Sequence, residues 1–301
     1  MTINKLTTAN KTEISTIGLG TFPLQGTEIS NIVEKAINTG YQLIDTADDY
    51  RGETGIGIAI RKLIEKQYIK REDIFIQTKI SANSAYFPEP LAGIYFNKYS
   101  SFMKRHSVEE IVREKVFISL REMKTEYLDS LLIHLPYENY YLPIWETIIQ
   151  LKNEGKIRYI GVSNFHKYHI EHLRKATGVM PDINEIYVSP IGTKQNQIDY
   201  ANENNIQIMT YSPLMDLQAG RIDISYLQPL MKKYNKSAAQ IILRWNIERG
   251  CIPLPKTKSE KRLKENLDVF DFELTTNEVK LINNMNKDFQ YLPESRICPG
   301  L

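Results

Sequence analysis

Cysteine is scarce in this sequence: Cys251 and Cys298 are the only two among 301 residues. Two thiols are too few for a disulfide framework or for a metal site built from several thiolates. Long apolar runs are missing as well, since none reaches the roughly 20 residues that span a bilayer, and the first residues form no apolar signal segment. We therefore expect a protein of the reducing cytoplasm with no membrane partner.

An excess of charge of one sign is also absent. The formal net charge is +2, with 25% charged and 42% hydrophobic residues. This is the balance of an ordinary globular protein. A net charge so close to zero gives no long-range attraction to nucleic acid, so we expect no nucleic-acid partner.

Short apolar runs alternate with segments of helical periodicity nearly to the end of the chain. Helical periodicity is found at 30–39, 108–123 and 145–153, the last closed by Gly155 in the position of a helix cap. Strands are predicted at 17–20, 41–45, 74–79, 128–134, 159–162, 183–187, 206–211 and 252–254. Eight such units in series predict an α/β fold in which a parallel sheet closes into a (β/α)8 TIM barrel.

Two segments extend this minimal barrel. Residues 6–17 include Asn10-Lys11, a turn signal that predicts an N-terminal hairpin at the barrel floor. Residues 81–107 form an enlarged loop after the third strand, rich in tyrosine and phenylalanine, which argues against disorder. This loop either covers the barrel mouth as a lid or packs against the rim or a second subunit. We see no linker and expect residues 1–301 to form a single domain.

Four ionisable residues follow three of the predicted strands: Asp45, Tyr50, Lys79 and His134. In a barrel, the carboxyl ends of the strands carry the catalytic groups. A free tyrosine, with a pKa of about 10, holds its proton too tightly to be an ideal acid, but a neighbouring ammonium favours the phenolate. A carboxylate would keep the lysine charged, and an imidazole would orient a substrate oxygen. Together these groups can deliver a proton to a carbonyl that receives a hydride.

The sequence motifs around these residues are more specific to one protein family. They are Ile44-Asp45-Thr46-Ala47 with Tyr50 and Glu53, Leu132-Ile133-His134-Leu135-Pro136, and residues 155–165. With them the chain resembles the aldo-keto reductase family along nearly its whole length, and the family's catalytic tetrad matches Asp45, Tyr50, Lys79 and His134. The resemblance implies reduction of an aldehyde or ketone to an alcohol by NADPH, with Tyr50 as the proton donor.

The expected cofactor site is not a Rossmann fingerprint, because Pro23 stands where the third glycine after Gly18 and Gly20 would be. The resemblance instead implies NADPH/NADP+ contacts from barrel loops, at Gly20, Thr21, Phe22, Asp45, Ser163, Asn164, Glu185, Tyr211, Ser212, Leu214, Lys256, Thr257, Arg262, Glu265 and Asn266. Lys256 and Arg262 would provide two cations for the 2′-phosphate. The alternative for this charged segment is a solvated helix face.

The chain departs from the family pattern at several of these positions. Glu185 replaces a glutamine that contacts the carboxamide, and an ionised carboxylate cannot donate a hydrogen bond. Asp49 replaces a residue that is often apolar; it either favours a polar or cationic substrate or points outward. The resemblance implies substrate contacts from Phe22, Asp49, Tyr50, His134 and Leu135.

Three histidines, His166, His169 and His172, recur every three residues on a predicted helix. No cysteine or suitably placed carboxylate completes a metal site with them, so we interpret them as surface residues and expect no metal.

Two other functions use the same fold. One is an NADP(H)-binding regulatory subunit with little turnover, and the other is the reverse reaction, alcohol oxidation. We expect a small-molecule carbonyl substrate and a monomer or homodimer.

Overall fold

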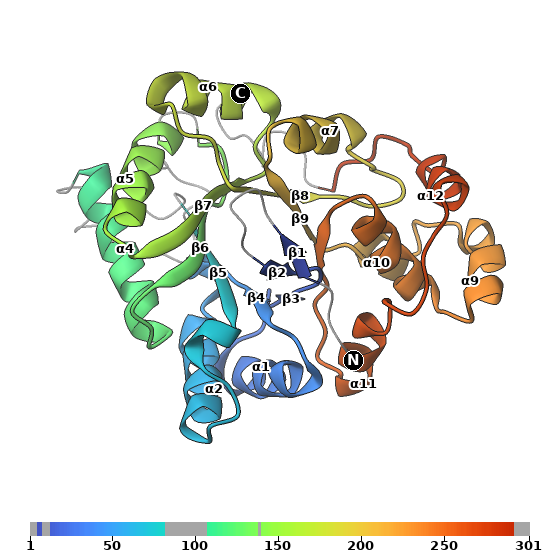
Figure 1. Cartoon of the computed structure of the whole chain (residues 1–301), viewed down its shortest axis with the longest axis horizontal. Helices are drawn as coiled ribbons and strands as arrows, with labels where there is room; N and C mark the ends of the chain where they lie inside the picture. Colours follow the sequence, from blue (N-terminus) through green and yellow to red (C-terminus); the bar gives the residue numbers. More distant parts are fainter. Residues whose placement is uncertain (1–4, 8–12, 82–106, 138–139, 292–301) are drawn as a thin grey trace. The chain divides into compact units, whose positions relative to one another are not determined.

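The computed structural model of the chain describes residues 5–7, 13–81, 107–137 and 140–291 (Figure 1). Its strands are β1 (Lys5–Thr7), β2 (Glu13–Ser15), β3 (Leu19–Gly20), β4 (Leu43–Asp45), β5 (Phe75–Ile80), β6 (Leu128–Ile133), β7 (Ile157–Ser163), β8 (Ile183–Tyr187), β9 (Gln207–Tyr211) and β10 (Ile252–Leu254). Its α-helices are α1 (Gly26–Thr39), α2 (Glu53–Glu65), α4 (Val108–Glu122), α5 (Tyr141–Asn153), α6 (Lys167–Thr177), α7 (Gln195–Glu203), α8 (Met215–Gln218), α9 (Gln228–Tyr234), α10 (Ala238–Glu248), α11 (Glu260–Leu267) and α12 (Thr276–Asn283). Short 3-10 helices are η1 (Asp48–Tyr50), η2 (Arg71–Asp73) and η4 (Ile224–Tyr226).

Strands β3 to β10 form one eight-stranded sheet in the order β10-β9-β8-β7-β6-β5-β4-β3. The two outer strands are also joined, because Gly18 N donates to Pro253 O at 3.0 Å and Gly20 N to Pro255 O at 3.2 Å. At this seam a Cβ on Gly20 would lie 2.7 Å from the carbonyl oxygen of Leu254, so the close approach requires glycine. The sheet is therefore a nearly closed barrel with helices between its strands.

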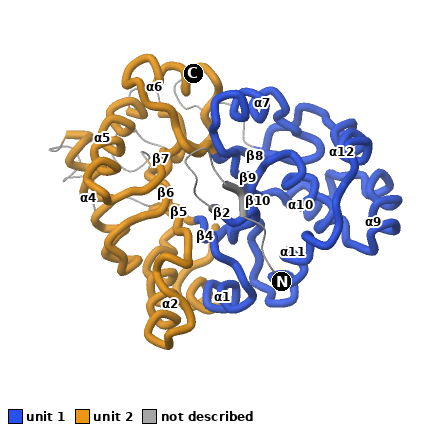
Figure 2. Tube along the Cα trace, in the orientation of Figure 1, with its two compact units in different colours: residues 1–21, 32–45, 185–291 blue, residues 22–31, 46–184, 292–301 orange. Residues whose placement is uncertain are grey.

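The described residues group into two compact units, shown in separate colours in Figure 2. Unit 1 holds residues 5–7, 13–21, 32–45 and 185–291, and fully buried side chains such as Leu19, Leu43 and Met209 form its core. Unit 2 holds residues 22–31, 46–81, 107–137 and 140–184, and Ile76, Leu132 and Trp145 are buried in its core. Apolar residues in consecutive positions of the strands are expected where both faces of a sheet are covered.

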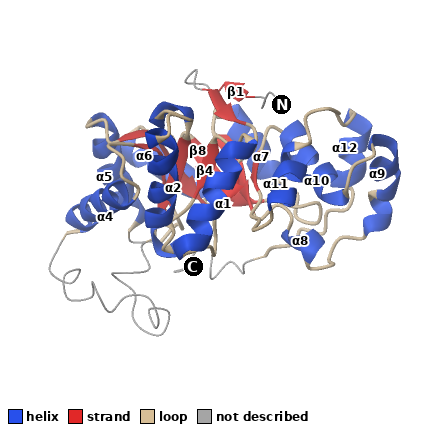
Figure 3. Ribbon diagram, turned by 90° about the horizontal axis from the view of Figure 1, so that it is seen from below, coloured by secondary structure: helices blue, strands red, loops and turns tan. Residues whose placement is uncertain are grey.

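The hairpin predicted ahead of the barrel is confirmed in its strands. β1 and β2 pair antiparallel, with Lys5 opposite Ser15 and Thr7 opposite Glu13 (Figure 3). The expected turn at Asn10-Lys11 lies outside the described residues, as does the loop predicted over 81–107 apart from Ser81 and Ser107.

Strand positions agree with the sequence analysis within two residues at each end. Helices α1 and α5 begin four residues earlier than predicted. In α5 this is possible because Pro143 lies in the first turn, where no backbone N–H is needed for an intrahelical bond. The helix ends as expected, with Gly155 in the left-handed region at φ +75° just past the cap. No helix in the described part of the chain combines the length and apolar character needed to cross a membrane.

Candidate active site

Tyr50 and His134, both in unit 2, approach each other just beyond the carboxyl ends of β4 and β6. Tyr50 closes η1, the turn that follows β4, and His134 comes directly after β6. The Tyr50 hydroxyl lies 3.4 Å from His134 Nε2, and the two rings meet nearly edge to face. Phe22 covers the phenol with its ring centroid 4.9 Å away, and 59% of its surface is exposed. A phenol and an imidazole thus meet at one point beside an exposed aromatic ring.

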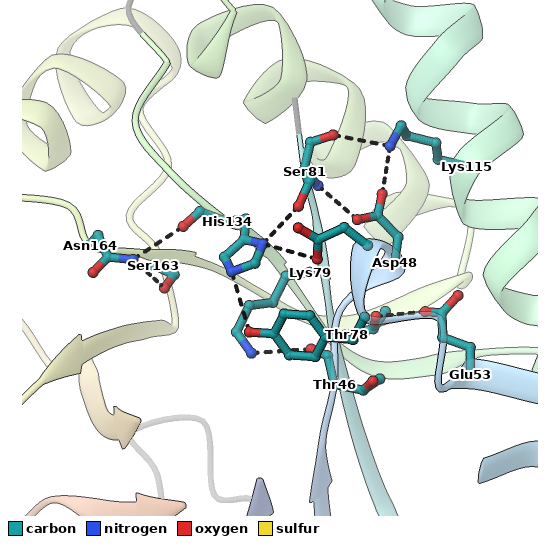
Figure 4. A network of polar contacts seen from close by, with 12 residues as sticks. Thr46, Asp48, Glu53, Thr78, Lys79, Ser81, Lys115, His134, Ser163 and Asn164 are labelled. Carbon is teal, nitrogen blue, oxygen red and sulfur yellow. Dashed lines mark hydrogen bonds and ion pairs between the residues drawn. The ribbon is translucent and has the colours of Figure 1, made fainter. Parts of the chain in front are cut away.

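A buried ammonium lies close to this phenol. Lys79, in β5, has no solvent exposure, and its Nζ donates to the carbonyl oxygen of Thr46 at 3.1 Å (Figure 4). The same Nζ lies 5.5 Å from the centroid of the Tyr50 ring. A cation held this near in a dry site favours the phenolate over the phenol. Asp45 is the last residue of β4, immediately before Thr46, and is also buried.

The other imidazole nitrogen of His134 faces a polar network. Ser81 Oγ lies 2.7 Å from Nδ1, and Asp49 Oδ1 lies 3.6 Å from the same atom. Asp48 Oδ1 accepts from the backbone N–H of Ser81 at 3.1 Å, and Lys115 Nζ donates both to Asp48 at 2.6 Å and to the carbonyl of Ser81 at 3.0 Å (Figure 4). Burial raises the pKa of Asp49, while Ser81 and the charges of nearby lysines act in the opposite direction.

A second buried carboxylate lies one helical turn beyond the phenol. Glu53, at the start of α2, accepts from Thr78 Oγ1 at 2.7 Å and from Ser119 Oγ at 2.9 Å. Burial raises its pKa to about 7, and the negative charge of Asp48 acts in the same direction. This carboxyl group links β5, α2 and α4 beneath the site.

Two of the predicted cofactor residues lie beside His134. Ser163 ends β7, and Asn164 follows it with a left-handed backbone at φ +62°. The Asn164 amide donates to Ser163 Oγ at 3.0 Å and to the carbonyl of His134 at 3.3 Å. Both are nearly fully buried, so their polar atoms are held in fixed positions at the end of β7.

The remaining candidates for dinucleotide binding lie in unit 1. Tyr211 ends β9, Ser212 follows at φ +49°, and Leu214 precedes α8. After β10, Lys256 is exposed in the segment before α11, and Arg262 is exposed in the first turn of α11, which Ser259 caps. Two cations at a helix N-terminus make a favourable environment for a phosphate.

Four other predicted cofactor residues of unit 1 differ in their burial and hydrogen bonding. Thr21 Oγ1 donates to the carbonyl of Asp45 at 2.8 Å, and Glu185 is buried in β8. Asn266 is buried in α11 and hydrogen-bonds Tyr41, whereas Glu265 lies on the more exposed side of that helix, 3.7 Å from Lys261.

The model of the Aldo/keto reductase family matches residues 16–287. The chain belongs to the aldo/keto reductase family. It is 36% identical over 280 residues to glyoxal reductase of Bacillus subtilis, covering 93% of this chain and 91% of the relative. It is 31% identical over 280 residues to methylglyoxal reductase DkgA of Escherichia coli K12, covering 92% of each. The crystal structure of Bombyx mori aldo-keto reductase AKR2E4 in complex with NADP superposes with a TM-score of 0.84 at 28% identity, covering 98% of this chain and 97% of that one. The family and the (β/α)8 fold expected from the sequence are thus confirmed.

One expectation about this aldo/keto reductase was wrong for His169. The histidines of α6 were interpreted as surface residues, but His169 is buried, with its ring centroid 3.9 Å from that of Tyr168. His172 Nδ1 lies 2.6 Å from the Tyr141 hydroxyl. Aromatic residues from α5 and α6 surround the buried imidazole of His169, whereas His172 contacts Tyr141 and remains exposed; a sequence repeat does not reveal such partners. Within the described residues, no group of three His, Cys, Asp or Glu side chains is arranged to hold a metal ion.

One of the two alternatives considered for Asp49 is also wrong. It neither points outward nor stands apart from the predicted tetrad, since its Oδ1 approaches His134. Sequence reasoning missed Ser81 and Lys115. The signal available for Ser81 was its position two residues after Lys79, beyond the end of β5. For Lys115 there was none, because its partner Asp48 is 67 residues away in the chain.

Proposed function

We propose that this aldo/keto reductase reduces a small aldehyde or ketone to the alcohol with NADPH, and that Tyr50 gives the proton. The observation that carries the assignment is the position of the Tyr50 hydroxyl, 3.4 Å from His134 Nε2 and close to the buried ammonium of Lys79. Glyoxal and methylglyoxal reductases among the relatives favour a small carbonyl substrate.

When bound, NADPH would supply the hydride that the carbonyl carbon receives. Negative charge then develops on the carbonyl oxygen, and Tyr50 donates its proton there. Lys79 stabilises the resulting phenolate because its charge is held in a site from which water is excluded. Asp45 carries the compensating negative charge, and His134 orients the carbonyl oxygen through Nε2.

The donor set of the chain fits this cofactor. The Ser163 hydroxyl and the Asn164 amide, at the end of β7, would hold the carboxamide, with Glu185 accepting from its NH2 group. Tyr211 would stack on the nicotinamide and Ser212 and Leu214 would line the pyrophosphate path. The remaining contacts would come from Gly20, Thr21, Phe22, Asp45, Lys256, Thr257, Arg262, Glu265 and Asn266. Phe22, Asp49 and Leu135 would contact the substrate with Tyr50 and His134.

The test is oxidation of NADPH by purified protein in the presence of methylglyoxal and of 4-nitrobenzaldehyde. We expect turnover, and Tyr50→Phe should lower kcat by at least about 100-fold, which is the lower end for a general acid. Tyr68→Phe is the matched control, since Tyr68 is exposed in the turn that follows α2. Absence of turnover over a panel of aldehydes, or full activity of Tyr50→Phe, would refute the assignment.

The alternative of a regulatory subunit is not favoured, because the relatives of this chain include proteins named as reductases. Tight NADPH binding without turnover would revive it. A single domain, a cytoplasmic location and a monomeric or homodimeric state complete the proposal, and size-exclusion chromatography with light scattering tests the last of these.

A further inference from the structure

The carboxylate of Asp49 has an unusual position for a group outside the tetrad. Its Oδ1 is buried and lies 3.6 Å from His134 Nδ1. The opposite nitrogen, Nε2, faces Tyr50. Asp49 is therefore placed to act on the imidazole from the side away from the phenol.

Ser81 connects the two groups. Its hydroxyl lies 2.7 Å from Nδ1 and also hydrogen-bonds Asp49. Its backbone is fixed from two directions, because the N–H donates to Asp48 and the carbonyl accepts from Lys115. A hydroxyl can accept one hydrogen bond while it donates another, so it can accept from Nδ1–H and donate to the carboxylate.

This trio is not a hydrolytic triad. In such a triad the serine and the carboxylate occupy opposite nitrogens of the imidazole. Here Ser81 and Asp49 both face Nδ1, which leaves Nε2 available to Tyr50 and to a substrate oxygen.

We propose that Asp49 is a positioning residue for His134: acting directly and through Ser81, it keeps a proton on Nδ1 and favours the doubly protonated imidazole, whose Nε2–H then donates to the substrate carbonyl. This inference rests on the proposed reductase function. A neutral imidazole with its proton on Nδ1 can only accept at Nε2, whereas the charged form donates from both nitrogens. A charge-assisted donor also stabilises the developing oxyanion more strongly than a neutral one.

The charged groups around His134 determine the pH range in which Asp49 can influence its imidazole. His134 is faced by Asp49 and Tyr50 from η1 and by Ser81, with Lys79 of β5 nearby. The positive charge of Lys79 opposes that of an imidazolium, whereas the charges of Asp48 and Lys115 offset each other in their ion pair. Because burial raises the pKa of Asp49, this carboxylate loses its charge at a higher pH than a free aspartate does. At low pH Asp49 therefore no longer stabilises the protonated imidazole of His134.

A direct test uses ¹⁵N NMR of histidine-labelled protein, with His134 assigned by its absence in His134→Gln. The wild-type spectrum should show a protonated Nδ1, and Asp49→Asn should lower the titration midpoint of His134 by about one pH unit, a tenfold change in the protonated fraction. Ser81→Ala should also reduce the share of the Nδ1-protonated tautomer. Asp223→Asn, an exposed aspartate of unit 1, is the control and should change neither.

Kinetics give a second readout. In Asp49→Asn, kcat with methylglyoxal should fall by up to about tenfold at pH values above the wild-type titration midpoint of His134 and change little well below it, while the dissociation constant for NADPH stays within twofold. Asp49→Glu should recover part of the loss. An unchanged His134 titration in folded Asp49→Asn would overturn the inference, even if the wild-type protein is an active reductase. An inactive wild type would instead count against the proposed function, and the NMR result would still decide the role of Asp49.

Discussion

Substitution of Glu53 by glutamine should make the protein more stable at alkaline pH. Glu53 is 2% exposed, and its pKa rises from 4.5 to about 7 on folding, chiefly because burial disfavours the charged form. The native state therefore binds the proton more tightly than the unfolded chain does. Stability from this group is fully present below about pH 4.5, declines as the pH rises and is lost above about pH 7.

The size of the effect follows from the shift. Each pKa unit corresponds to 1.36 kcal/mol, so the wild-type protein should lose about 3 kcal/mol of unfolding free energy between pH 4.5 and 8 through this residue. A glutamine side chain in this place would be neutral throughout and can still accept from Thr78 while its NH2 group donates to the Ser119 oxygen. The variant should therefore match the wild type near pH 5 and exceed its stability at pH 8.

Urea denaturation followed by circular dichroism at several pH values between 5 and 8 measures this difference. The exposed Glu65, at the other end of α2, provides the control Glu65→Gln, which should leave the pH dependence nearly unchanged. If the free-energy difference between Glu53→Gln and wild type were independent of pH, Glu53 would not be a proton-binding group of the native state.

Three further substitutions test other parts of the molecule. Arg262→Ala should raise the KM for NADPH about tenfold and leave the KM for NADH nearly unchanged, since only NADPH carries the 2′-phosphate. The control is Lys264→Ala, a lysine of the same helix that is ion-paired with Glu260. Gly20→Ala should cost about 1–3 kcal/mol of stability in urea titrations, because its Cβ would meet the Leu254 carbonyl at 2.7 Å; an unchanged midpoint would argue against the tight seam between β3 and β10. Lys79→Met should abolish measurable turnover and lower the thermal unfolding temperature, since it leaves the buried carboxylate of Asp45 without its compensating charge; retained turnover would contradict the role of the ammonium.

The sequence predicted most of the barrel because its evidence is local. Apolar runs and helical periodicity arise within short segments, and parallel strands place their carboxyl ends at one edge. That rule was enough to expect Tyr50 and His134 near each other, and they are. It was also enough to expect Lys79 beside the phenol.

What the sequence did not predict depends on side-chain direction or on distant partners. The inward direction of Asp49 is set by the single turn of η1, whose orientation no periodicity determines. The environment of His169 depends on Tyr141, which belongs to another helix, α5. Lys115 fixes Ser81 from α4, across a stretch of 34 residues. Contacts of this kind leave no pattern in a single sequence.

The cost of the site's charges explains why so many hydroxyl and carbonyl groups surround it. Lys79, Asp45 and Glu53 are almost fully buried, and a buried charge is tolerated only when polar groups replace the lost water. A backbone carbonyl receives the ammonium, and Thr78 and Ser119 donate to Glu53. Apolar side chains at these positions would fold more readily, so stability alone gives no reason for the arrangement. Proton transfer does give one, because the pKa of a phenol can be tuned by an ammonium only where water does not screen the charge.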